Sequence, residues 1–256
     1  GGSGNDTLIA RGGTTTLKGE TGNDTYRFLG NWGQVTIDDT SGSNVLDFSA
    51  QTQGVRIDDA ENKAYQGANT VSWANTGSTI DTIKGGLGND TIDLSGRLAN
   101  SLTTLTGKDA GWILGTATGM AQSGLSASTD MATASQNQGT GFKFQGFENF
   151  IGGRGSDVVR VRDGAYLSGS IRGDSTQGEL DNARNTLDFS EDTTSVVVNE
   201  EGLSSFGSGN NGRIQVRGFH NLFGGQANDF LTGDGRNNLI VGNGGDDSLA
   251  GQAGAD

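Results

Sequence analysis

The sequence contains no cysteine, no proline and a single histidine among its 256 residues. Without cysteine the chain cannot form a disulfide framework, and it offers neither a thiol nucleophile nor a cysteine-based zinc site. The lone His220 also argues against a metal site built on two histidines. These absences exclude the disulfide-rich secreted domains, the zinc fingers and the thiol enzymes.

Basic residues and long apolar runs are also scarce. The chain has 17 Lys+Arg against 30 Asp+Glu, a formal net charge of −13, whereas binding to a nucleic-acid backbone requires an electropositive face. The longest apolar runs, such as SVVV at 195–198, are far shorter than the roughly 20 residues that span a bilayer. The chain begins with glycine and has no charged and then apolar leader. We therefore expect no nucleic-acid partner and no transmembrane segment, and we expect any targeting signal to lie outside these residues.

Glycine is the residue in excess, with 46 copies, while only 31% of residues are hydrophobic. Composition alone would allow a disordered linker, but the order of the residues does not. A nine-residue phrase recurs, with glycine first, Asp or Asn sixth and an apolar or aromatic residue eighth. The phrases are GGSGNDTLI from Gly1, GETGNDTYR from Gly19, GGLGNDTID from Gly85, GGRGSDVVR from Gly152, GGQANDFLT from Gly224, GDGRNNLIV from Gly233, GNGGDDSLA from Gly242 and GQAGAD from Gly251.

Each fixed position of the phrase has a physical reason. Glycine allows positive φ and a tight turn that exposes carbonyl oxygens, and the aspartate adds an anionic oxygen where the turn ends. The last three residues form a short strand with one inward side chain. Because one such turn buries little, it must stack on copies of itself. Oxygens from stacked turns would then converge at about 2.3–2.6 Å on a hard cation, for which calcium is best suited.

The phrase resembles the calcium-binding nonapeptide of the RTX (repeats-in-toxin) proteins. In that family two nonapeptides form one coil, so turns eighteen residues apart stack with calcium between them. The resemblance implies an all-β fold, a right-handed parallel β-roll or β-solenoid with degenerate metal-free coils, and multiple Ca²⁺ ions. It implies ligands from the side chains of Asp6, Asp24, Asp90, Asp157, Asp229, Asp247 and Asp256 and from the turns of Gly1, Gly4, Gly19, Gly22, Gly224 and Gly242.

The implied sites differ in their partners. Asp6 and Asp24 are eighteen residues apart, as are Asp229 and Asp247, so each pair would flank one row of calcium ions. Asp90 and Asp157 lack such a partner, and for them a solvated turn residue and a calcium ligand remain equal alternatives, with stacking expected on a degenerate coil at Asn44 or Asn185. The side facing Asp256 carries Asn238 and Arg236, and we expect a weak or empty site there.

A longer period overlies the short one. The phrases at Gly19, Gly85, Gly152 and Gly224 recur at intervals of 66, 67 and 72 residues. We predict a first coil at 1–18, three super-repeats at 19–84, 85–151 and 152–223, and an uninterrupted nonapeptide roll at 224–256. The echoes NVLDFSA from Asn44 and NTLDFSE from Asn185 predict metal-free coils held by stacked apolar residues, and residues 116–140 predict a long exposed loop or decorated coil.

Some residues also allow a catalytic or ligand-binding interpretation. The pairs Asp38–Asp39 and Asp58–Asp59 could serve glycosidic chemistry, but strand-end charge or extra calcium ligation is favoured. His220 stands in GFHNLF where a sister phrase has Glu148, which predicts a surface position. The three tryptophans could stack on sugars, but we favour plugs at coil ends or covers over loops; they are Trp32, Trp73 and Trp112.

The favoured function is a calcium-stabilised, non-enzymatic structural or adhesive module of a secreted or cell-surface protein, such as an adhesin or a surface-layer component. The resemblance implies type I secretion and folding on calcium outside the cell. The alternative is the non-catalytic C-terminal module of a secreted protease, lipase or polysaccharide-modifying enzyme; a β-helix enzyme acting on polysaccharide is less favoured. Besides calcium, self-association, neighbouring repeats of the same chain and a polysaccharide or cell-surface ligand stay open as partners.

Overall fold

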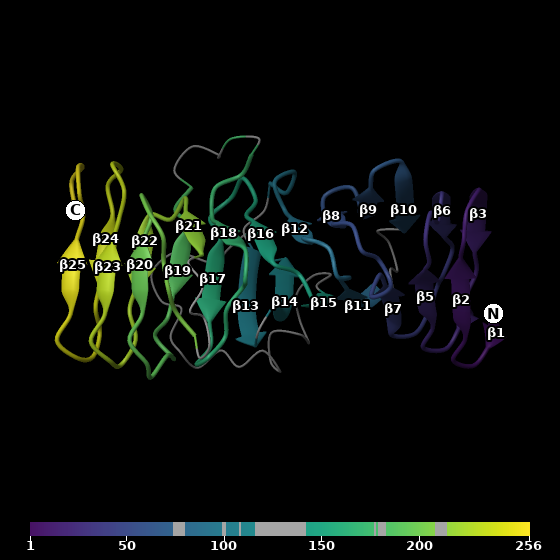
Figure 1. The fold of residues 1–256 in the computed structure, drawn as a ribbon, viewed down its shortest axis with the longest axis horizontal. Helices are drawn as coiled ribbons and strands as arrows, with labels where there is room; N and C mark the ends of the chain where they lie inside the picture. Colours follow the sequence, from purple (N-terminus) through teal and green to yellow (C-terminus); the bar gives the residue numbers. More distant parts are fainter. Residues whose placement is uncertain are drawn as a thin grey trace.

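The computed structural model describes residues 1–73, 80–98, 101–107, 109–115, 142–176, 178, 183–207 and 214–256. These residues form strands, turns and bends without a helix, so the expected all-β fold is confirmed. It follows that the described residues include no helix long and apolar enough to cross a membrane. The predicted loop at 116–140 lies outside them. Figure 1 shows the strands stacked along one long axis with the two termini at opposite ends.

Two large sheets share most of the strands. The eleven-stranded sheet has the order β2 (Thr7–Ala10), β5 (Thr25–Phe28), β7 (Asn44–Asp47), β11 (Ile80–Lys84), β15 (Phe142–Gln145), β14 (Ala110–Gly115), β13 (Ser101–Gly107), β17 (Val158–Val161), β19 (Thr186–Asp188), β22 (Asn221–Phe223) and β24 (Leu239–Val241). The nine-stranded sheet has the order β21 (Gln215–Arg217), β18 (Ser170–Arg172), β16 (Asn149–Ile151), β12 (Thr91–Asp93), β8 (Arg56–Asp58), β9 (Lys63–Gln66), β10 (Asn69–Trp73), β6 (Gln34–Ile37) and β3 (Thr14–Leu17).

Two smaller sheets complete the stack. One pairs β1 (Gly2–Ser3) with β4 (Glu20–Thr21), and the other contains β20 (Val197–Asn199), β23 (Phe230–Thr232) and β25 (Ser248–Ala250). Apart from β8–β10 and β13–β15, which each stay in one sheet, successive strands belong to different sheets, so the chain builds the stack layer by layer as in a solenoid. Because the large sheets run across the predicted boundaries after residues 18, 84 and 151, the division into super-repeats stays a prediction.

Most neighbouring strands are parallel and in register, for example Leu8 beside Tyr26 and Leu187 beside Leu222. Two strands depart from this rule. Strand β9 is antiparallel to both β8 and β10, and β14 is antiparallel to both β13 and β15. Each large sheet therefore contains one reversed strand; short connections join β9 to β8 and to β10, and join β14 to β13. The sequence analysis did not predict these reversals.

Inward side chains form one continuous apolar core along the stack. At its N-terminal end Phe28 stacks on Phe48 with ring centroids 4.4 Å apart, and Trp32 lies 5.5 Å from each ring. Trp32 is fully buried and Trp73 is half-buried against the core, so for these two tryptophans burial agrees with the structural interpretation. The side chain of Trp112 lies outside the described residues.

Three corners of the solenoid share an Asp-x-Ser turn in which the serine N–H donates to the aspartate Oδ1. An arginine on the neighbouring strand pairs with each aspartate, so these corners are joined to the next coil without metal. The serine–aspartate distances are 2.9 Å for Ser49–Asp47, 2.8 Å for Ser95–Asp93 and 3.0 Å for Ser190–Asp188, and the ion pairs are Arg27–Asp47 at 3.7 Å, Arg56–Asp93 at 2.7 Å and Arg160–Asp188 at 3.1 Å.

Candidate metal-binding turns

Each nonapeptide turn is named here after its first residue, and its positions are numbered from that residue. The sixth position links neighbouring coils. The Asp6 N–H donates to Oδ1 of Asp24 at 2.7 Å, and the Asp24 N–H donates to Oδ1 of Asn44 at 2.6 Å. In the C-terminal part the Asp229 N–H donates to Oδ1 of Asp247 at 2.9 Å. The predicted stacking of turns eighteen residues apart is thus present for both aspartate pairs.

The same row of hydrogen bonds, which we call the Oδ1 ladder, passes through coils that lack the nonapeptide. Asp157 stacks on Asn185, as expected, with 2.9 Å between the Asp157 nitrogen and Oδ1 of Asn185. Asp90 instead donates its N–H to Oε2 of Glu148 at 2.7 Å. Both solitary aspartates are therefore hydrogen-bonded to a neighbouring coil, and both are fully buried rather than solvated.

The prediction that His220 lies on the surface is wrong. Its side chain is 5% exposed, and its Nδ1 accepts the Asn185 N–H at 3.3 Å, at the ladder position that Glu148 occupies in the sister phrase. The exchange of Glu for His therefore marks a buried acceptor. The phrase Gly-Phe-x-Asn, shared by both coils, was the available signal.

First-position glycines make room for the aspartates. A Cβ added to Gly1, Gly19, Gly242 or Gly251 would overlap Oδ2 of the sixth residue in its own turn. Glycines at the fourth position serve a second purpose: Gly4 and Gly22 have φ of 120° and 129°, a region that favours glycine. A Cβ on Gly22 would also overlap the carbonyl oxygen of Gly4 in the stacked turn.

The second carboxylate oxygen divides the aspartates into two kinds. Oδ2 of Asp90, Asp157 and Asp229 accepts the N–H of the second residue in the same turn, at 2.5, 2.7 and 2.6 Å. Oδ2 of Asp6 and of Asp24 is buried and has no hydrogen-bond partner among the described residues. A buried, unpaired carboxylate oxygen is costly, and a hard cation is the kind of partner that would satisfy it.

Around Asp24 a second carboxylate approaches the same space. The α-carbon of Gly19 faces both Asp24 and Asp39, and Oδ2 of Asp39 accepts the Tyr26 hydroxyl and the Asn44 Nδ2 amide. Burial and the neighbouring Asp39 raise the pKa of Tyr26, which stays a hydrogen-bond donor. The chain therefore holds two carboxylates beside one glycine.

The other predicted carboxylate pairs are engaged in ion pairs. Asp38 lies 2.9 Å from Lys18, Asp58 lies 3.0 Å from Arg56, and Arg97 lies 2.7 Å from Asp59, whose pKa burial raises. This arrangement favours structural charge over catalysis. In the part of the chain that the structure describes, no three Asp, Glu or His side chains gather to hold a metal alone. A calcium ion here would need main-chain carbonyl oxygens beside one or two carboxylates.

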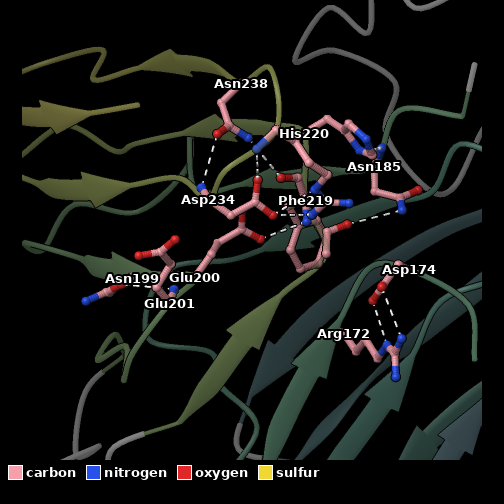
Figure 2. A network of polar contacts seen from close by, with 12 residues as sticks. Arg172, Asp174, Asn185, Asn199, Glu200, Glu201, Phe219, His220, Asp234 and Asn238 are labelled. Atoms are coloured by element: carbon pink, nitrogen blue, oxygen red, sulfur yellow. Dashed lines mark hydrogen bonds and ion pairs between the residues drawn. The ribbon is translucent and has the colours of Figure 1, made fainter. Parts of the chain in front are cut away.

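The Gly233 turn contains no aspartate at its sixth position and is embedded in a polar network (Figure 2). The Asp234 N–H donates to Oδ1 of Asn238 at 3.1 Å, and the Asn238 amide donates to the Phe219 carbonyl at 3.3 Å. Glu200 accepts the Phe219 N–H at 2.7 Å, while its Oε2 is buried without a partner among the described residues. Burial raises the pKa of Glu200 to about 8 and lowers that of His220.

The Gly1 and Gly19 turns fit calcium, because they combine unpaired buried carboxylate oxygens with first-position glycines that leave room beside them. Comparison with known families also indicates calcium binding. The model of the RTX calcium-binding nonapeptide repeat, in four copies, matches residues 1–27, 74–96 and 223–256. Among curated proteins, none matches the chain.

Proposed function

Since the chain contains RTX calcium-binding nonapeptide repeats, we propose that it is a calcium-stabilised structural or adhesive module of an extracellular or cell-surface protein, such as an adhesin or a surface-layer component. Repeats of this kind belong to secreted proteins, where they are typically structural and non-catalytic. The module would leave the cell by type I secretion and complete its folding on calcium outside. A non-catalytic module of a secreted enzyme would use the same mechanism.

The buried, unpaired Oδ2 atoms of Asp6 and Asp24 carry this proposal. Both belong to stacked turns, in which the Asp6 N–H donates to Oδ1 of Asp24 and the Asp24 N–H donates to Oδ1 of Asn44. The chain also has 30 acidic against 17 basic residues, so its carboxylates repel one another when no cation is bound. Calcium binding would remove that repulsion, and its free energy would become free energy of folding.

The residues of the chain would divide the work. Except at Asp6, Oδ1 of the sixth-position aspartate accepts an N–H from the neighbouring coil. An Oδ2 without a bond of its own, as in Asp6 and Asp24, would face the ion. The first-position glycines leave room for Oδ2 of the aspartate in their own turn, and the fourth-position glycines bring the stacked turns together. When bound, calcium supplies the positive charge that two facing carboxylates require. We assign this role first to Asp6 and Asp24, whose Oδ2 atoms are buried and without a hydrogen-bond partner among the described residues.

Interruption of the repeat favours a structural module over the compact C-terminal roll of an enzyme. Between the matched segments the stack continues through coils that contain the Arg160–Asp188 ion pair and the Asp-x-Ser corners at Ser49 and Ser190. In such a stack each coil contacts only the neighbouring coils, so the stack can extend and serve as a spacer or a scaffold.

A calcium titration of the 256-residue chain tests the proposal. Starting from chelated protein, far-ultraviolet circular dichroism should show a gain of β signal as calcium is added, and magnesium at the same concentration should give a much smaller gain. Light scattering in the same samples reports whether copies associate. A spectrum and a melting temperature that chelator leaves unchanged would overturn the calcium mechanism.

A further inference from the structure

We infer that the nonapeptide turns exist in two backbone forms, open and closed, and that only open turns take calcium. The closed turns replace the cation with an N–H group of the chain itself. This inference rests on the proposed calcium function and divides it: calcium would act on the ends of the stack, while the centre would hold without it.

Open turns have left-handed backbone at both the second and the fourth positions. This holds for the Gly1, Gly19, Gly242 and Gly251 turns. Their φ values are 111° at Gly2 and 120° at Gly4, 78° at Glu20 and 129° at Gly22, 70° at Asn243 and 107° at Gly245, and 72° at Gln252 and 134° at Gly254.

In the Gly1 turn the second N–H does not donate to the aspartate. The Gly2 N–H donates to the Gly19 carbonyl at 3.0 Å rather than to Asp6. Three of the four second positions carry a side chain despite their left-handed φ, which is strained backbone. Strain that persists in a repeated turn points to a functional requirement.

Closed turns lack left-handed backbone at the second position, which is glycine for a different reason. The φ of Gly86, Gly153 and Gly225 lies outside the left-handed region, and each N–H donates to Oδ2 of the aspartate in its own turn. A Cβ on Gly225 would come within 2.5 Å of the Asp192 carbonyl oxygen in the preceding coil. Glycine here permits close approach of two backbones.

Closed turns leave no carboxylate oxygen for a cation. Oδ1 of Asp157 accepts the N–H and the hydroxyl of Ser101, at 2.9 and 2.6 Å, while Oδ2 accepts the Gly153 N–H. Asp90 is satisfied in the same way by Val55 and Gly86. A calcium ion would have to displace these hydrogen bonds. Calcium binding therefore stabilises a closed turn less than it stabilises an open turn.

The Gly1 and Gly19 turns form a stack of two open turns. The coil that follows has Asp39 at its first position, where the nonapeptide has glycine, and a left-handed Gly42 at its fourth, with φ of 96°. Asp39 therefore adds a carboxylate beside Asp24. By contrast, the Gly242 turn stacks on the closed Gly224 turn, in which Oδ2 of Asp229 is already bonded. The strongest calcium binding should thus occur in the Gly1 and Gly19 turns, at Oδ2 of Asp6 and of Asp24.

Hydrogen–deuterium exchange of the 256-residue chain, with calcium and with chelator, tests this division. Calcium should slow exchange at least tenfold in peptides from residues 1–48 and also in those from 242–256. It should change exchange less than twofold in peptides from 85–98 and 149–172. Equal protection in all four regions would overturn the two-form inference and leave the calcium function standing. No protection anywhere, together with no calcium binding by calorimetry, would overturn both.

A matched pair of variants gives a second test. Asp24→Asn should remove the calcium-dependent protection of residues 1–48 and weaken calcium binding at least tenfold. Asp157→Asn, at the same position of a closed turn, should leave calcium stoichiometry and affinity unchanged. If Asp157→Asn lowers calcium stoichiometry, closed turns bind calcium and the inference is wrong. Should Asp24→Asn fail to fold in calcium as well as in chelator, exchange in the unmodified chain decides alone.

Discussion

The turns that begin at Gly1 and at Gly85 read GGSGND and GGLGND, and their first six residues differ only at the third position. Their backbones nevertheless differ. In the first, Gly2 and Gly4 are left-handed and Oδ2 of Asp6 has no partner. In the second, the Gly86 N–H closes on Asp90.

Neighbouring coils explain the difference. The Gly1 turn stacks on another nonapeptide turn, whose Thr21 carbonyl accepts the Gly4 N–H at 2.9 Å. The Gly85 turn packs against a coil of unrelated sequence, where the Gln51 carbonyl accepts the Leu87 N–H at 2.7 Å and leaves no space beside Gly86. The motif therefore gives the capacity to bind a cation, and the neighbouring coil decides whether that capacity is kept.

The largest effect should come from filling the open turn. In Gly19→Ala the new Cβ would overlap Asp24, Asp39 and the Tyr26 hydroxyl. Overpacking costs about 1–3 kcal/mol, and loss of a site occupied at 100 times its Kd removes about 2.7 kcal/mol more. We expect the free energy of unfolding in calcium to fall by about 4 kcal/mol in urea denaturation.

The matched control for this substitution is Gly235→Ala. Gly235 is exposed, its φ is not left-handed, and no atom lies within 4 Å of an added Cβ. The Gly235→Ala substitution should leave the free energy of unfolding and the calcium affinity equal, within experimental error, to those of the unmodified chain. A Gly19→Ala protein that binds calcium normally would contradict the assignment of the space beside Gly19.

The polar network of the Gly233 turn, which has no aspartate at its sixth position, should respond to pH rather than to calcium. Burial raises the pKa of Glu200 to about 8 from an ordinary value of 4.5. The folded state therefore binds this proton more tightly than the unfolded state, and stability falls as pH rises from about 4.5 through 8. At saturating calcium we expect a loss on the order of 3 kcal/mol between pH 5 and 9. Glu200→Gln, which keeps an acceptor for the Phe219 N–H, should flatten that profile; an identical slope in both proteins would show that another group titrates.

Ion pairs should matter more in the closed centre than at the open end. Arg160 lies 3.1 Å from Asp188, and both side chains are largely buried, whereas Arg27 is 46% exposed and lies 3.7 Å from Asp47. Arg160→Met should cost about 2 kcal/mol by leaving a buried carboxylate unpaired. Arg27→Met should cost less than about 0.5 kcal/mol. Thermal melts in 1 M salt sharpen the contrast, since salt screens the exposed pair and barely affects the buried one; equal costs would contradict it.

Much of the stack could be predicted from the sequence, because its period is written in residues with one physical role each. Glycine, aspartate and an apolar residue at fixed spacing predicted stacked turns with short strands, and the resemblance to the RTX repeat implied that the strands are parallel. A degenerate coil at Asn44 or Asn185 was expected beside Asp157, and Asn185 is its partner. Strands β9 and β14 escaped prediction because alternation of polar and apolar residues is the same in parallel and antiparallel strands. The buried role of His220 escaped because surface exposure was inferred from an exchange that conserves a hydrogen-bond acceptor.

The open and closed forms could not be predicted, because a glycine at the second position does not indicate left-handed backbone there. The second position is glycine in the closed turns at Gly86, Gly153 and Gly225, whereas left-handed second positions carry Glu20 and Asn243. A glycine in a sequence shows that positive φ is allowed at that position. It does not show whether the position has a left-handed backbone or lies close to another backbone. Only the contact with the neighbouring coil makes that distinction.

The smallest predicted effect isolates the backbone of the open form. Glu20 has φ of 78°, so Glu20→Gly relieves strain worth about 1 kcal/mol, offset in part by the greater freedom of glycine in the unfolded chain. We expect a net gain of about 0.5 kcal/mol in urea denaturation. Thr21→Gly, one residue further in strand β4 without left-handed φ, should instead lose about 0.5–1 kcal/mol. If Glu20→Gly loses as much as Thr21→Gly, the second position of this turn is not left-handed in solution, and the Gly19 turn would have to be assigned to the closed form.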